Sequence, residues 1–145
     1  MDLQAFFMEN TEKTEQVTFV ASKRFVKDGK PVPWIIRCIT GEQDDAIRAS
    51  CMRRVQVPGR KNQFTREIDA NAYVCKLAVA CTVYPNLNDQ ALQDSWGVMG
   101  AEALLKTMLN PGEYADYAAK VQEVCGFDAS MDELVDEAKN LSLIH

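Results

Sequence analysis

Apolar and polar residues alternate from Gln16 to Val26, as in a strand that buries one face. Asp28-Gly29 tolerates the positive φ angles of a two-residue hairpin turn, so we expect a return strand over residues 32–39. Pro33 has no amide hydrogen, which places that part of the hairpin at a sheet edge or a bulge. Because a lone hairpin is marginally stable in water, this one must pack on helices, gain a third strand or pair with another chain.

Helix caps and apolar stripes follow the hairpin. Thr40 and Gln43 form a capping box, which predicts a helix that ends near Val55. Asp69 is placed to cap a helix over residues 70–82, whose broad apolar face predicts burial on most sides. That face comprises Tyr73, Val74, Leu77, Ala78, Ala80 and Cys81.

Shorter helices are predicted after Pro85, which ends the apolar helix. Asn88 or Asp89 caps a helix through Asp94, and two glycines then precede a helix over residues 101–109. Another helix lies between Pro111 and Gly126. Ser130-Met131-Asp132-Glu133 is a second capping box, and it opens a last helix whose apolar residues are Leu134, Val135 and Ala138.

These patterns predict an α+β fold, in which an N-terminal β-hairpin, or a small antiparallel sheet, precedes a predominantly helical C-terminal bundle. A chain of 145 residues fits one domain. We therefore expect a single domain over residues 1–145, with the hairpin in residues 1–68 and the helices in residues 69–145.

Two further segments are candidates for binding. Leu3, Phe6 and Phe7 have the spacing of one helix face. We favour the interpretation that they close over the core, and the alternative is a hook for another subunit.

Residues 53–66 contain no acid and form either a second hairpin or a flexible loop. Their bases are Arg53, Arg54, Arg60, Lys61 and Arg66.

Charge is distributed unevenly along the chain. The net charge is −5, but residues 111–145 carry −6 and the remainder carries +1. The basic segment could neutralise several phosphates, yet it has only Phe64 as an interleaved aromatic residue, and the overall acidity disfavours nucleic acid. An acidic protein, or the acidic C-terminal helices of a second copy, would fit the same surface.

Catalytic and metal-binding patterns are missing from the sequence. The five cysteines are widely spaced, and no two of them form a Cys-x-x-Cys pair. This spacing is typical of cysteines that serve as small buried residues in a reducing cytosol. The single histidine is His145, at the end of the sequence. We therefore expect no enzyme activity, no metal and no cofactor. No signal peptide or membrane span is predicted, so the expected location is the cytoplasm.

A resemblance to a known family rests on three stretches: residues 77–89 (LAVACTVYPNLND), 92–105 (LQDSWGVMGAEALL) and 112–114 (GEY). They resemble the tail assembly chaperones of Gram-positive contractile-tailed phages and defective prophages. The similarity extends from Leu3 to the helix that contains Ala138. It implies a non-enzymatic protein that binds the tape measure protein in the bacterial host cytoplasm and keeps it soluble while the tail tube polymerises.

The resemblance also implies further partners. Genes of this family commonly use a programmed ribosomal frameshift near the end of this reading frame, so a frameshift-extended form of the chain is a possible partner. A homo-oligomer is another. The alternative function is a small regulatory or nucleic-acid-binding module that uses residues 53–66, and it predicts binding to nucleic acid that weakens steeply with salt.

Overall fold

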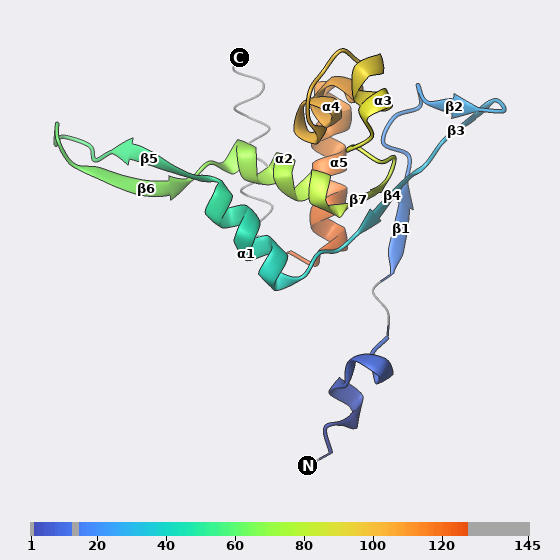
Figure 1. Cartoon of the computed structure of the whole chain (residues 1–145), viewed down its shortest axis with the longest axis horizontal. Helices are drawn as coiled ribbons and strands as arrows, with labels where there is room; N and C mark the ends of the chain where they lie inside the picture. Colours follow the sequence, from blue (N-terminus) through green and yellow to red (C-terminus); the bar gives the residue numbers. More distant parts are fainter. Residues whose placement is uncertain (1, 13–14, 128–145) are drawn as a thin grey trace.

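A three-stranded antiparallel sheet packed against helices forms the centre of the protein (Figure 1). The computed structural model describes residues 2–12 and 15–127. The strands are β1 (Gln16–Phe19), β2 (Val26–Lys27), β3 (Lys30–Pro31), β4 (Trp34–Arg37), β5 (Met52–Gln56), β6 (Phe64–Ile68) and β7 (Thr82–Tyr84). The α-helices are α1 (Gly41–Ser50), α2 (Ala70–Cys81), α3 (Gln90–Ser95), α4 (Ala101–Met108) and α5 (Pro111–Val124). The predicted α+β fold is confirmed.

The central sheet has the order β1-β4-β7. Val17 pairs with Ile36 and Phe19 with Trp34, so these four apolar residues share one face. The third strand, β7, follows α2 directly and pairs with β4 across a bulge between Ile35 and Ile36. The sheet thus supplies the third strand that the predicted hairpin required.

The predicted strand from Gln16 to Val26 is interrupted. β1 ends at Phe19, and the chain then bends through the buried residues Ala21 and Ser22 before the two-residue strand β2. The predicted turn is present: Asp28 and Gly29 have φ angles of 53° and 78° between β2 and β3. The return strand is likewise divided, and Pro33 lies in the gap between β3 and β4.

Helix starts agree with the predicted caps. The Thr40 capping box is complete, and the side chains of Asp69 and Asp89 accept amide hydrogens from Ala72 and Leu92. The expected end of the first helix near Val55 is wrong, because α1 stops at Ser50. β5 begins at Met52 and pairs with β6, so cross-strand hydrogen bonds replace the further helical turn.

The core lies between the sheet and helices α2, α4 and α5. Trp34 of β4 and Tyr117 of α5 are buried, and their ring centroids are 5.1 Å apart in an edge-on arrangement. The predicted apolar face of α2 is buried, with one correction: Ala80 is exposed. The capping box at Ser130 and the last helix lie outside the described residues.

A buried tyrosine links the first two helices. The Tyr73 hydroxyl donates to Asp44 Oδ1 at 2.5 Å and accepts from Arg48 at 3.3 Å, and the Arg48 guanidinium lies 4.6 Å from the ring centroid. Arg48 also pairs with Asp44 at 2.8 Å. α1 is therefore held to α2 by polar contacts at its first and second turns.

Replacing Tyr73 by Phe should lower the free energy of unfolding by about 1–2 kcal/mol, because Asp44 and Arg48 lose a partner in a partly buried network. Urea denaturation of the full chain measures the change. Tyr84→Phe is the control, since Tyr84 is half exposed, and it should shift stability by no more than about 0.5 kcal/mol. Equal stability of Tyr73→Phe and the parent protein would contradict this role.

Candidate protein-binding surfaces

Residues 2–12, here called the N-terminal arm, project away from the sheet and helices (Figure 1). The side chains of Leu3, Phe6, Phe7 and Met8 are 59%, 79%, 42% and 89% exposed. The expectation that Leu3, Phe6 and Phe7 close over the core is therefore wrong. Large apolar side chains exposed together on a folded protein mark a contact surface.

The arm is built from two 3₁₀ turns, Gln4–Phe6 and Met8–Asn10. Phe7 between them has an extended backbone, with ψ at 141°, so the turns do not join into one α-helix. Asn10 and Thr11 side chains donate to the carbonyl oxygens of Gln4 and Phe7. These hydrogen bonds are local, and the apolar side chains remain available to a partner.

Residues 52–68 form a second projection, here called the basic hairpin (Figure 1). The sequence left a hairpin and a loop as alternatives, and the structure has β5 paired with β6. Because side chains alternate across a strand, Arg54 and Arg66 share one face, and Arg53 lies on the other. Arg53 pairs there with Glu67 at 3.0 Å.

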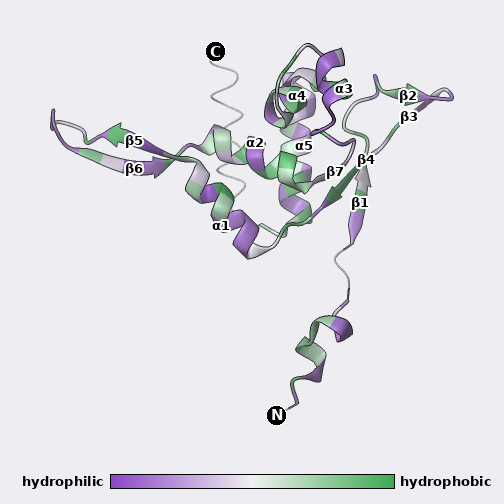
Figure 2. Ribbon diagram, viewed as in Figure 1, coloured by the Kyte–Doolittle hydropathy of each residue, from purple (hydrophilic) through white to green (hydrophobic). Residues whose placement is uncertain are grey.

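The remaining two bases, Arg60 and Lys61, lie in the turn of the hairpin, which is hydrophilic (Figure 2). Gly59 has a φ of 77°, and the Gln56 side chain donates to the carbonyl oxygens of both bases. The five bases are thus divided between two faces and a tip. The bases therefore lie in three separate places and do not form the single basic surface that the sequence suggested.

An apolar groove of about 390 Å³ lies beside the β2–β3 hairpin. The sequence gives no sign of this groove, because its lining residues come from segments far apart in the chain. Val26 and Tyr84 in its lining are exposed, and Phe25, also in the lining, packs edge-on against Trp96. The lining residues are Arg24, Phe25, Val26, Val32, Trp34, Tyr84, Pro85, Leu92 and Met108.

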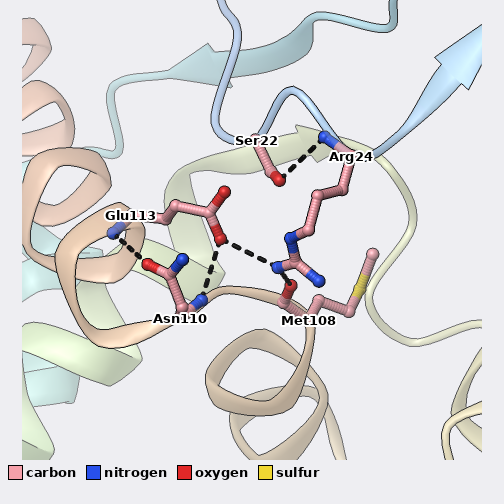
Figure 3. A network of polar contacts seen from close by, with 5 residues as sticks. All are labelled: Ser22, Arg24, Met108, Asn110 and Glu113. Atoms are coloured by element: carbon pink, nitrogen blue, oxygen red, sulfur yellow. Dashed lines mark hydrogen bonds and ion pairs between the residues drawn. The ribbon is translucent and has the colours of Figure 1, made fainter.

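Arg24 anchors one side of this groove to the start of α5 (Figure 3). Its guanidinium donates to the Met108 carbonyl oxygen at 2.5 Å and to the Glu113 carboxylate at 2.8 Å. Glu113 also closes a capping box with Asn110. Hydrogen bonds from Arg24, Ser22 and the Asn110 amide lower the pKa of Glu113 from 4.5 to about 2.

The cysteines are all free thiols. Cys81 and Cys125 have their sulfur atoms 3.6 Å apart, and Cys38 lines the same small pocket as Cys125.

In the described part of the chain, no three His, Cys, Asp or Glu side chains are grouped to bind a metal ion. Every helix among residues 2–12 and 15–127 is too short or too polar to span a bilayer.

Comparison with known proteins identifies the family. The model of the phage XkdN-like tail assembly chaperone proteins matches residues 3–139. This chain belongs to the XkdN-like tail assembly chaperone family. Membership supports a role in phage tail assembly and agrees with the resemblance found in the sequence.

Relatives in Bacillus subtilis (strain 168) match this family member over nearly its whole length. The uncharacterized protein YqbN is 34% identical over 141 residues, which cover 96% of this chain and 93% of YqbN. XkdN of the phage-like element PBSX is 30% identical, covering 96% and 94%. The crystal structure of YqbN superposes with a TM-score of 0.75 at 29% identity, over 88% of this chain and 98% of that one.

Replacing Glu113 by Gln should cost about 1 kcal/mol at pH 7, after allowance for screening of a partly exposed ion pair. The low pKa of Glu113 gives stability that is complete above pH 4.5 and is lost as pH falls toward 2. The parent and the variant should therefore converge over that range. Urea denaturation at pH 7 and pH 3 tests this.

Glu123→Gln is the matched control, because Glu123 is 73% exposed and pairs only loosely with Lys120 at 3.4 Å. Its effect should stay within about 0.5 kcal/mol at both pH values. If Glu113→Gln behaved like Glu123→Gln, the Arg24 network would contribute nothing measurable.

Proposed function

We propose that this protein is a non-enzymatic tail assembly chaperone that binds the tape measure protein and keeps it soluble during tail tube assembly in the bacterial host cytoplasm. Family membership supports the tail assembly role. The client and the mode of binding are our inference. The observation that carries it is the N-terminal arm, which presents four large apolar side chains outside the core.

A chaperone for a long, aggregation-prone client must cover apolar surface on that client. Leu3, Phe6 and Phe7 offer apolar area without taking any from the core of the chaperone. Burying one such side chain contributes about 1.5–3 kcal/mol, so a few copies of this short arm are enough for appreciable affinity. The net charge of −5 opposes aggregation of the chaperone itself.

Charge gives a second set of candidate contacts. Arg53, Arg54, Arg60, Lys61 and Arg66 are proposed to bind acidic protein surface. We propose two protein partners besides the client: another copy of this chain and a frameshift-extended form of it. Both partners would carry the same N-terminal arm and the same basic hairpin as this chain.

Replacing both Phe6 and Phe7 by Ser should weaken client binding by about tenfold or more, because two apolar side chains no longer lose contact with water on binding. The measurement is the soluble fraction of the tape measure protein on co-expression with the variant. Since both side chains are exposed, the variant itself should keep the parental free energy of unfolding to within about 0.5 kcal/mol.

Met99→Ser provides the matched control. Met99 is 90% exposed and lies on the main body rather than on the arm, so this change should leave client solubility unaltered. If the Phe6/Phe7 variant solubilised the client as well as the parent protein does, the arm would have no part in client binding.

A further inference from the structure

The basic hairpin has two arginines directly opposite each other. Arg54 of β5 is the cross-strand partner of Arg66 in β6. Side chains in such a pair lie about 5 Å apart at Cβ, and like charges there destabilise the pairing. The neighbouring pair, Arg53 with Glu67, has opposite charges. Only one face of the hairpin therefore lacks charge balance within the ribbon.

The same face carries exposed apolar groups. Phe64 is 48% exposed, and the Arg54 guanidinium lies 3.7 Å from the centroid of its ring. Met52 is 39% exposed. Only Val55 and Ile68 of the ten strand residues are partly covered. A two-stranded ribbon with so little cover is marginally stable in water. A surface of carboxylates beside apolar side chains would balance the charge and cover the apolar groups.

The sequence of this chain contains such a surface. Residues 128–139, here called the acidic segment, lie outside the described residues and carry five acids and one base. Met131, Leu134, Val135 and Ala138 have the spacing of one helix face. Asp132, Glu133, Asp136 and Glu137 fall between them. The charge and the apolar pattern complement the Arg54/Arg66 face.

The place where the described chain ends favours a second copy as the source of this segment. Phe127 lines a pocket with Thr40 and Gly41, at the N-terminal end of α1, whereas the hairpin begins after the C-terminal end. α1 has 10 residues and is about 15 Å long. Residues 128–130, which separate Phe127 from the first apolar residue of the acidic segment, span at most about 11 Å. This is less than the length of α1, so the apolar residues of the same chain begin short of the hairpin. A neighbouring copy has no such limit.

We propose that the Arg54/Arg66 face of the basic hairpin binds the acidic segment of a second copy of this chain. The inference rests on the self-association included in the proposed function. It assigns the hairpin to contacts between copies and leaves the N-terminal arm for the client. Each copy would use its hairpin on one neighbour and its acidic segment on another.

Replacing Arg54 and Arg66 by Glu in the full chain should weaken self-association by about tenfold or more, as measured by sedimentation velocity across a concentration series at low salt. Lys27→Glu with Lys30→Glu is the control. These exposed lysines also face each other across two strands, in the β2–β3 hairpin. Their replacement changes the net charge equally, and the variant should associate like the parent protein. Equal loss in both variants would overturn the assignment, and so would a parent protein that stays monomeric throughout.

Reversing the charge of the acidic segment gives the complementary variant, with Asp132, Glu133, Asp136 and Glu137 each replaced by Lys. Alone, it should also fail to associate. Mixed with the Arg54/Arg66 variant, it should restore association, because each chain then offers the charge that the other lacks. Failure of the mixture to associate would refute contact between these two surfaces in different copies.

Arg54→Gln with Arg66→Gln separates binding from folding. The lost repulsion between the two arginines offsets the lost contact of Arg54 with the Phe64 ring, so the free energy of unfolding should stay nearly unchanged while self-association falls. A loss of association with a matching loss of stability would mean that the arginines support the hairpin and bind no partner. None of these measurements contains the client, so they can fail while the client-binding role of the arm stands.

Discussion

The contact between Trp34 and Tyr117 is the interaction on which the arrangement of the protein depends. Trp34 lies on the central strand β4 and Tyr117 on α5, and both side chains are buried with ring centroids 5.1 Å apart. The Tyr117 hydroxyl also lies 2.6 Å from that of Thr82, at the start of β7. One side chain thus joins α5 to the centre and to one edge of the sheet.

Among the described residues, two segments with the chemistry of a binding surface lie outside that centre. The N-terminal arm precedes edge strand β1, and the basic hairpin connects α1 to α2. Each has the chemistry of a binding surface: the arm exposes Phe6 and Met8, and the hairpin pairs Arg54 with Arg66. The arm is apolar and the hairpin carries the charge, which fits the proposed binding of a client by one segment and of other copies by the other.

Features that depend on nearby residues could be predicted from the sequence. The caps at Thr40, Asp69 and Asp89 are hydrogen bonds across three residues, and all are present. Interactions across long separations could not be predicted. β7 exists because β4 pairs with it, and Arg24 reaches Glu113 across 89 positions. Sequence alone had no signal for either, although the spacing of Asn110 and Glu113 could have indicated their capping box.

The candidate surfaces show the same division. The basic segment was visible as a run of charges, but the cross-strand register alone separates Arg54 and Arg66 from Arg53. The apolar spacing of Leu3, Phe6 and Phe7 is compatible with either a buried or an exposed face. In the structure they are exposed, on an arm that the extended backbone at Phe7 divides into two short turns.

The first test of client binding is to co-express the full chain with the tape measure protein, purify the soluble material and determine its mass by light scattering. We expect a soluble complex in which many copies of this chain accompany each client molecule. An insoluble client beside a free chaperone would contradict it.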